Sequence, residues 1–383
     1  MFHTSHIEIS RSALTHNLRF IREYIGENVL LSSVVKGNAY GHGIEAFVPL
    51  AEDCGVNHFS VFSADEAFRV TKVIKGDCTI MIMGMLDKEQ TEWAIRNDIE
   101  FFVFDVERLE NACRFAKKIG KRAKIHIEVE TGMNRTGFSI REYPKVVQIL
   151  KQENQHIVFR GLCTHFAGAE SIANYHRIKK QQGAYSRVLK RLTLQHLIPE
   201  LKHTACSAAT LRYPKTQMDL VRIGILQYGF FPSQEVLIHH LTKKKEEVYP
   251  LKRLITWKSK VMDIKSVKTG DFVGYGTSYL ANSNMTIATI PIGYSHGFSR
   301  SLSNQGRVLI HGQQVNVIGM VNMNMISVNI TNIEGVMRGD EVVIIGKQGD
   351  LEISVSSFSE FSDQVNYELL TRLPFDLPRK IIV

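Results

Sequence analysis

Short apolar runs alternate with amphipathic stretches from Val29 to Gly229. The runs are rich in Val, Ile and Phe, as is typical of parallel strands that are buried on both faces. They lie at Val29–Lys36, Asn57–Ser63, Cys78–Gly84, Ile99–Asp105, Lys124–Glu130, Ile157–His165, Leu201–Ser207 and Leu220–Tyr228. Helix-like segments separate them, for example Ala64–Lys75, Val106–Gly120 and Ala173–Gln195. Eight strands with intervening helices in about 200 residues predict a TIM-like (β/α)8 barrel.

A doubly wound sheet is the alternative architecture for such an alternating pattern. That fold uses fewer strands and places a glycine-rich turn after the first one. No G-x-G-x-x-G pattern is present in the chain. The barrel is therefore the favoured α/β architecture.

The pattern changes across Lys243–Tyr249, and beyond it short strands with period-two character follow one another without helical crossovers. They lie at Thr256–Lys265, Met285–Pro291, Arg307–Ile310, Gln314–Met320, Met325–Ile330 and Glu341–Ile345. Turn pairs such as Gly270-Asp271 and His311-Gly312 separate them. We expect a barrel domain over residues 1–243 and a mainly-β domain over residues 244–383. For the first ten or so residues, pairing with the mainly-β domain is an alternative to a place in the barrel.

Composition narrows the class of protein. The chain has 383 residues, which is long enough for about two domains. Its 44% hydrophobic and 22% charged residues are typical of globular proteins rather than disordered or collagen-like ones. Its apolar runs fall short of the ~18 residues of a membrane span, and no secretory signal is evident at the N-terminus. Five cysteines without a C-x-x-C pair argue against a disulfide framework and favour the cytoplasm.

The net charge of +9, from 47 basic and 38 acidic residues, raises the possibility of a nucleic-acid partner. The densest basic run, Lys243–Lys245, is followed at once by two glutamates, and no known nucleic-acid-binding motif stands out. We therefore expect neither a nucleic acid nor a membrane as a partner. His239-His240 has no third ligand at a suitable spacing, so we expect no metal site either.

Lys36 ends the first predicted strand and precedes a glycine-rich segment with Gly37, Gly41 and Gly43. Catalytic groups of barrels lie where strands end, so Lys36 would face the mouth of the barrel. An isolated lysine at a strand end is usually solvated. Burial beside apolar strand residues would lower its pKa and free the amine for Schiff-base chemistry, and the glycines would allow a ligand to approach the backbone.

The segment Val35-Lys36-Gly-Asn-Ala-Tyr40-Gly-His-Gly resembles the pyridoxal-phosphate signature of the alanine racemase family. Further segments resemble that family in the same order along nearly the full length. They are Thr131-Gly-Met-Asn-Arg135, Thr164-His165-Phe-Ala, Val221-Arg222-Ile-Gly224-Ile225, Gly274-Tyr275-Gly, Pro291-Ile-Gly-Tyr294, Asn322-Met323 and Asn366-Tyr367-Glu. Eight ordered matches are far more specific than one.

The resemblance implies a cytoplasmic isomerase that interconverts L- and D-alanine for D-alanine biosynthesis and peptidoglycan, with pyridoxal 5'-phosphate (PLP) as its cofactor. Racemisation requires bases on both faces of the substrate Cα. By resemblance these are Lys36, which holds the cofactor, and Tyr275 from the partner subunit of a homodimer whose active site lies at the subunit interface. A tyrosine with an ordinary pKa near 10 is a weak base, so it needs supporting neighbours. By resemblance His165 contacts Tyr275 and is hydrogen-bonded to Arg222.

The resemblance also implies which residues hold the small molecules. Arg222 would donate to the pyridine nitrogen of the cofactor, and because arginine does not give up its proton, that nitrogen would stay unprotonated. A less electron-withdrawing ring should disfavour transamination and decarboxylation. Phosphate would be bound by Tyr40, Ser207, the amides of Gly224 and Ile225, and Tyr367. Arg135, Tyr294 and the backbone of Met323 would bind the substrate.

Three positions depart from the family pattern. Glu128 stands where many relatives have a carbamylated lysine, and we hypothesise that it pairs directly with Arg135. Cys206 stands in place of an asparagine before Ser207, and Asn324 in place of an aspartate after Met323. The last change removes one negative charge at the site entrance, which bears on substrate preference.

Other functions remain as alternatives. A racemase for serine or other amino acids on the same scaffold is the nearest one. A decarboxylase of related fold fits less well, because an arginine at the pyridine nitrogen does not favour decarboxylation. A non-catalytic PLP-binding protein would leave Tyr275 and the β domain without a role, and a basic nucleic-acid-binding protein is the most distant alternative.

Overall fold

The computed structural model describes residues 3–245, 247–355 and 366–383, and these form two compact units. One unit comprises residues 12–36 and 48–253, and the other comprises residues 1–11, 37–47 and 254–383. The predicted arrangement of a barrel followed by a mainly-β region is confirmed. Within the described residues, no helix is both long and apolar enough to cross a lipid bilayer.

The first unit is built on eight parallel strands in the order β8-β7-β6-β5-β4-β3-β2-β9. Their bounds are β2 (Leu30–Val34), β3 (His58–Val61), β4 (Thr79–Ile82), β5 (Glu100–Val103), β6 (Ala123–Glu128), β7 (Ile157–Cys163), β8 (Leu201–His203) and β9 (Leu220–Ile223). Just beyond β8, the Ala205 carbonyl accepts a 3.0 Å hydrogen bond from the Arg222 amide of β9. Cys206 and Arg222 form an isolated parallel β-bridge. These contacts join the two terminal strands and close the ring.

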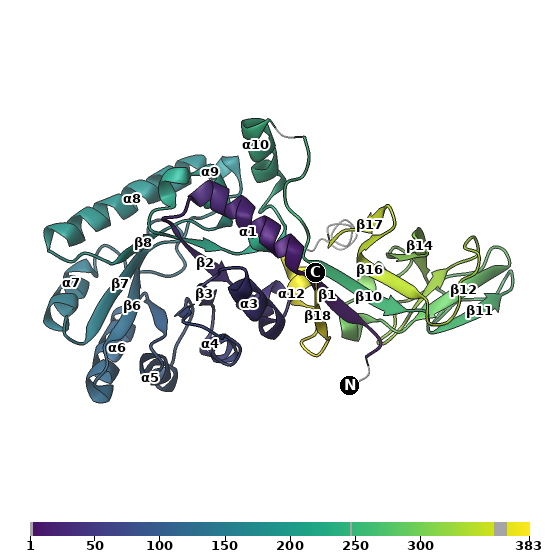
Figure 1. The fold of residues 1–383 in the computed structure, drawn as a ribbon, viewed down its shortest axis with the longest axis horizontal. Coiled ribbons are helices and arrows are strands. Elements are labelled where there is room, and N and C mark those ends of the chain that lie inside the picture. Colours follow the sequence, from purple (N-terminus) through teal and green to yellow (C-terminus); the bar gives the residue numbers. More distant parts are fainter. Residues whose placement is uncertain (1–2, 246, 356–365) are drawn as a thin grey trace. The chain divides into compact units, whose positions relative to one another are not determined.

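Helices flank these strands on the outside, as Figure 1 shows for α4 to α8. The helices up to residue 244 are α1 (Arg11–Ile25), α2 (Lys36–Tyr40), α3 (Ile44–Asp53), α4 (Ala64–Thr71), α5 (Lys88–Arg96), α6 (Val106–Ile119), α7 (Tyr143–Gln152), α8 (Tyr175–Leu194), α9 (Ser207–Arg212) and α10 (Gln234–Lys244). Most of α2 and the start of α3 belong to the second unit. Short 3-10 turns lie at η1 (Ile172–Asn174), η2 (Pro214–Thr216) and η3 (Ile225–Tyr228). Local sequence sets the helix ends: Asp105 caps the start of α6 and left-handed Gly120 ends it.

The second unit is built on a sheet with the strand order β11-β12-β15-β14-β13-β16-β10-β1-β18. Strand β17 lies off this path and pairs with β16. Its strands are β1 (His6–Ser10), β10 (Ile255–Lys260), β11 (Asp263–Val267), β12 (Met285–Ile290), β13 (Arg307–Ile310), β14 (Gln313–Ile318), β15 (Ile326–Asn329), β16 (Glu341–Gln348), β17 (Leu351–Ile353) and β18 (Arg379–Ile382). It also contains α12 (Asn366–Thr371), η4 (Tyr294–His296) and η5 (Arg300–Leu302). The first strand of the chain thus belongs to this sheet, between β10 and β18.

Turn chemistry explains the tightest hairpin of this sheet. Strands β13 and β14 are joined by His311 and Gly312, with φ of 49° and 72°. Two successive residues with positive φ match the right-handed twist of a hairpin, and glycine adopts that conformation readily. The turn predicted at His311-Gly312 is therefore confirmed. The single strand predicted at Thr256–Lys265 is wrong in detail, because the chain breaks it at Val261 and Met262 into β10 and β11, which pair with different neighbours.

His42 gives the second unit a dependence of stability on pH. Its ring is fully buried, and its Nδ1 lies 3.0 Å from the carbonyl oxygens of both Ala39 and Tyr40. Burial lowers the pKa of His42 to about 4. Because the unfolded chain binds this proton near pH 6.5, acidification favours unfolding as the pH falls from about 6.5 towards 4.

We expect the free energy of unfolding to drop by about 2 kcal/mol between about pH 7.5 and pH 5 because of this one group. The variant His42→Asn keeps an N–H donor for the two carbonyls but does not titrate, so its urea midpoint should change less on acidification than that of the parent protein. His176→Asn, at an exposed position, serves as the control. An equal pH response in His42→Asn and in the parent would contradict the prediction.

Candidate active site

Four of the predicted site residues lie together in the barrel unit. Lys36 follows β2, His165 follows β7, Arg222 lies on β9, and Arg135 lies in the loop after β6. Each of the three cations acts electrostatically on His165, and Arg135 and Arg222 both act on Lys36. The carboxyl ends of the strands therefore gather an amine, an imidazole and two guanidinium groups, as expected for a barrel mouth.

The amine of Lys36 is favoured in its neutral form. Although the residue retains solvent exposure, desolvation of its amine lowers the pKa of Lys36, and the positive charge of Arg135, then that of Arg222, lowers it further. Glu66 acts in the opposite direction but does not outweigh these effects. A lysine whose proton is more easily lost is the nucleophile that attachment to a carbonyl compound requires.

His165 is a neutral imidazole at physiological pH. Burial is the main cause that lowers the pKa of His165 to about 3, and the charges of Arg222, Arg135 and Lys36 add to it. Because the ring does not carry a charge, it offers one N–H donor and one acceptor nitrogen. It can therefore orient a hydroxyl group, and it does not add a fourth positive charge to the site.

Arg222 is held rigidly by the barrel. It is 5% exposed, and its Nη2 donates to the carbonyl oxygens of Thr164 at 2.8 Å and Thr204 at 3.4 Å. Its Nη1 donates to the Nδ1 of His203 at 2.5 Å and to the His203 carbonyl at 3.1 Å. Within the described part of the chain, no acceptor receives the Nε–H. One donor of a fixed, buried guanidinium thus remains for a ligand.

The hydrogen bond between His165 and Arg222 that the resemblance implied is not formed among the described residues. His203 takes that place beside Arg222, and His165 feels Arg222 only through its charge. The sequence analysis missed His203. His203 stands between Lys202 and Thr204, so the local pattern did not mark it as a buried polar residue that needs a partner.

The predicted phosphate-binding residues of the barrel come together at the start of two helical turns. The Oγ of Ser207, at the start of α9, accepts a hydrogen bond of 3.0 Å from the Gly224 amide. Ile225 begins η3, so its amide has no acceptor within that turn. Cys206 precedes α9 and makes no side-chain cap for it. A hydroxyl and two neighbouring amides are suited to an anion.

The segment that follows Lys36 has an unusual backbone. Gly37, Asn38, Ala39 and Tyr40 are all left-handed, with φ between 51° and 61°. Such a conformation is unfavourable for residues other than glycine and is held only where surrounding contacts require it. The side chain of Asn38 helps to hold it, because its Oδ1 accepts a 3.1 Å hydrogen bond from the Ile44 amide. Tyr40 is thereby fixed at the end of this turn, within the second unit.

The remaining predicted residues also belong to the second unit. Tyr275 is 74% exposed and stands between Gly274 and Gly276, which are both left-handed. Tyr294 and Met323 lie close along the backbone, because the residue before Tyr294, Gly293, packs against the backbone of residues 322–323. The approach is so close that a Cβ at Gly293 would lie 2.1 Å from the Asn322 carbonyl oxygen. Tyr367 has its backbone in α12, and its side chain lies outside the described residues.

Glu128 does not pair with Arg135 as hypothesised. Within the described residues no ion pair joins them, and Glu128 instead accepts a hydrogen bond from the Thr136 side chain. Burial is the main cause that raises the pKa of Glu128, and the charges of Arg222 and Arg135 oppose it. Thr136 follows Arg135 directly, so the carboxylate holds the loop that carries the arginine rather than the guanidinium itself.

We expect Glu128→Gln to leave the fold intact and to raise the KM for the amino acid about 3- to 10-fold, because the amide is a poorer acceptor and brings no charge to Arg135. Steady-state kinetics measures this change. Glu107→Gln, at an exposed position on α6, is the control variant. An unchanged KM in Glu128→Gln would show that the carboxylate does not position Arg135.

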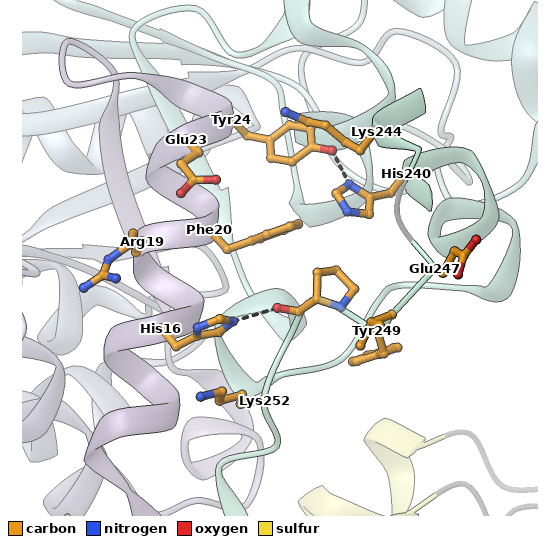
Figure 2. Close-up of a pocket in the computed structure, with 12 residues that line it drawn as sticks. His16, Arg19, Phe20, Glu23, Tyr24, His240, Lys244, Glu247, Tyr249 and Lys252 are labelled. Atoms are coloured by element: carbon orange, nitrogen blue, oxygen red, sulfur yellow. Dashed lines mark hydrogen bonds between the residues drawn. The ribbon is translucent and has the colours of Figure 1, made fainter. Parts of the chain in front are cut away.

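A separate pocket of about 590 Å³ lies in the barrel unit between α1, α10 and the segment 247–252. Figure 2 shows its lining, in which Tyr24 hydrogen-bonds to His240 and His16 lies 2.8 Å from the Pro250 carbonyl oxygen. Its charges are mixed, with Glu23 among basic side chains. It contains none of the predicted site residues, so we assign the chemistry to the barrel mouth.

Comparison with known proteins agrees with this assignment. Residues 9–232 match the family model "Alanine racemase, N-terminal domain", and residues 254–381 match "Alanine racemase, C-terminal domain". Alanine racemase 1 of Caldanaerobacter subterraneus is 33% identical over 97% of this chain and 93% of its own. The Bacillus anthracis alanine racemase with bound L-Ala-P has a TM-score of 0.89 at 31% identity, covering 100% of this chain and 96% of its own.

One neighbour of the same fold carries a different name. The histidine racemase of Leuconostoc mesenteroides has a TM-score of 0.88 and 28% identity, covering 99% of this chain and 98% of its own. The two family models together span both units, and the relatives match nearly end to end. On these grounds the chain is a member of the alanine racemase family.

Proposed function

We propose that this protein interconverts L- and D-alanine and uses PLP to do so. One observation carries the proposal: an amine with a lowered pKa, Lys36, shares the barrel mouth with a buried guanidinium, Arg222, that keeps one N–H free for a ligand. The full-length similarity to proteins named alanine racemase supports the choice of reaction and substrate.

The chemistry of the donor set fits PLP. Lys36 would hold the cofactor through its amine, the Nε–H of Arg222 would meet the ring nitrogen, and Ser207 with the amides of Gly224 and Ile225 would hold the phosphate. Tyr40 and Tyr367 would contribute hydroxyl groups to that phosphate. Bound PLP would supply an electron-withdrawing ring that stabilises negative charge at the substrate Cα after deprotonation.

The residues divide the proton transfers between them. Lys36, once released from the cofactor, would take or return a proton at its Nζ, which the two neighbouring arginines favour in the neutral form. Tyr275 would do the same at its Oη on the opposite face of Cα. His165, neutral, would orient that hydroxyl, and Arg135 would bind the substrate carboxylate.

We propose a homodimer in which Tyr275 acts in the partner's site. The exposure of Tyr275 supports this, as does that of two further large apolar side chains of the same unit: Phe272 is 51% exposed and Met323 is 55% exposed. Large apolar side chains exposed at a surface are typical of protein–protein contacts. We also place the reaction in the cytoplasm, consistent with five cysteines that are all free thiols.

One experiment tests the proposed function. The purified protein is supplied with PLP, its visible absorbance is recorded, and L-alanine, L-serine and L-histidine are each incubated with it before chiral analysis. We expect a visible band for the bound cofactor and fastest racemisation of alanine. A protein that binds no PLP, or that racemises none of these substrates, would refute the proposal.

The alternative is a preference for another amino acid, which the histidine racemase neighbour keeps open. Asn324, which the resemblance places at the entrance, donates a 2.9 Å hydrogen bond to Ser295, whose own hydroxyl donates to the Met323 carbonyl at 2.7 Å. We expect Asn324→Asp to add a negative charge there and to shift the ratio of kcat/KM for alanine to that for serine by about 3-fold or more. Equal changes for both substrates would exclude a role of Asn324 in side-chain preference.

A further inference from the structure

A chain of buried polar side chains runs through the inside of the barrel and ends at Arg222. Glu100 begins β5, His126 lies in the middle of β6, and His203 ends β8. Their exposed fractions are 2%, 0% and 0%. The Nε2 of His126 lies 2.8 Å from Glu100 Oε2, the His126 Nδ1 lies 2.8 Å from His203 Nε2, and His203 Nδ1 contacts Arg222 at 2.5 Å.

The hydrogen bonds of this chain have only one consistent direction. Because arginine can only donate, the Nδ1 of His203 must be the acceptor, and the proton of its neutral ring is on Nε2. That N–H donates to His126 Nδ1, so the proton of His126 is on Nε2 and is donated to Glu100. Burial lowers the pKa of both His126 and His203, which agrees with two neutral rings.

The carboxylate end of the chain is ionised and compensated. Burial alone would raise the pKa of Glu100, but the hydrogen bond from His126 and the nearby His58 ring, whose Nε2 lies 3.6 Å from Oε2, hold it well below its usual range. Arg160 neutralises the charge, with its Nε 2.6 Å from Glu100 Oε1 and its Nη1 2.6 Å from Glu200. A fixed acceptor therefore stands at the far end and sets the tautomers of both histidines.

Two irregularities of the barrel accommodate these side chains. Strand β7 pairs Phe159 with Ile125 and Gly161 with His126, so Arg160 is left over as a bulge and its side chain reaches Glu100. A Cβ at Gly161 would lie 2.0 Å from His126 Nδ1, the atom that accepts the bond from His203. An apolar barrel interior would need neither feature.

We propose that His203 is a positioning residue for Arg222, kept in its acceptor tautomer by His126 and Glu100. His203 holds the Nη1 side of the guanidinium, and the Thr164 and Thr204 carbonyls hold the Nη2 side, so that the Nε–H edge remains fixed towards the ligand. Outer hydrogen-bond partners of this kind orient a functional group and keep its donors aligned. The inference rests on the proposed function, in which Arg222 meets the cofactor ring.

Two conservative variants separate the two bonds of His203. An asparagine amide oxygen can take the position of the ring Nδ1, so His203→Asn keeps an acceptor for Arg222 and loses the bond to His126. A glutamine amide reaches the position of Nε2, so His203→Gln keeps the bond to His126 and loses the acceptor for Arg222. Tyr185→Phe, which removes a buried 2.8 Å hydrogen bond to the Leu162 carbonyl elsewhere in the barrel, controls for general destabilisation.

Each variant is made in the parent and in an Arg222→Gln background, and three quantities are measured: the Kd for PLP by absorbance titration, kcat for racemisation, and the Tm. We expect His203→Gln to weaken PLP binding and lower kcat by about 10- to 100-fold, and His203→Asn to stay within about 3-fold of the parent. In the Arg222→Gln background the effect of His203→Gln should shrink to about 3-fold or less, because the two residues act as one unit.

The outcomes are decisive in both directions. Equal losses in His203→Gln and His203→Asn, losses no larger than in Tyr185→Phe, or a full loss in the Arg222→Gln background would each overturn the positioning role. The parent protein is measured first. If it binds PLP and racemises alanine while these patterns fail, the inference alone is wrong; if it does neither, the proposed function is wrong.

Discussion

Lys36→Ala should abolish the visible absorbance of bound PLP and lower racemisation by at least about 10⁴-fold, which combines the loss of covalent attachment with the loss of one of the two proposed bases. The structure supports this expectation, because Lys36 is the amine at the end of β2 whose pKa is lowered by desolvation and further by the neighbouring arginines. Absorbance after PLP addition and chiral analysis of alanine measure the two effects.

A matched variant makes the result specific. Lys202 lies in strand β8 of the same barrel and pairs with Asp219 at the surface, with an Nζ to Oδ2 distance of 3.3 Å. Lys202→Ala should keep both the absorbance and the activity. If Lys36→Ala retained the visible band, the cofactor would be attached elsewhere, and the proposed site would be wrong.

Tyr275→Phe should lower racemisation by about 10³-fold while PLP binding remains, since removing one general base typically costs 10²- to 10⁴-fold. One face of the substrate Cα would still meet Lys36. In deuterated water we therefore expect Cα deuterium exchange to continue for one alanine enantiomer and to be lost for the other. Tyr294→Phe serves as a comparison, because it changes a substrate-binding hydroxyl and spares the base. Loss of exchange for both enantiomers would contradict the assignment.

Mixing the two inactive proteins tests whether Tyr275 acts across a dimer. A mixed dimer of Lys36→Ala and Tyr275→Phe chains has one site with neither base and one site with both, provided that the tyrosine comes from the partner. After random exchange of subunits, roughly a quarter of the parent activity should return. If Tyr275 served the site of its own chain, mixing would restore nothing.

The barrel could be predicted from the sequence because its strands are apolar on both faces and its helices carry end signals. Ser207 illustrates the limit of such reasoning. From its local sequence alone, Ser207 would be interpreted as the N-cap of a helix. In the structure Cys206 occupies the N-cap position, and the Ser207 hydroxyl instead accepts a hydrogen bond from the Gly224 amide. That bond joins segments seventeen positions apart in sequence, and only the closed ring of strands brings them together.

The network behind Arg222 was beyond prediction for a related reason. Glu100, His126 and His203 lie on three different strands, and the space for the His126 side chain depends on the shift of register between β6 and β7, which places Gly161 opposite it. Periodicity along one strand does not reveal such a shift. The direct pairing of Glu128 with Arg135 failed similarly, because the local backbone presents Thr136 to the carboxylate.

The place of β1 has a consequence for how the protein is made. Ile7 lies between Trp257 of β10 and Arg379 of β18, so β1 is enclosed by two strands that are synthesised far later. At about 5–20 residues per second, β1 waits roughly ten seconds to a minute for β10 and longer for β18. Its two buried isoleucines, Ile7 and Ile9, stay uncovered during that time. Completion of this sheet is therefore a late event, which waits until β18 has left the ribosome.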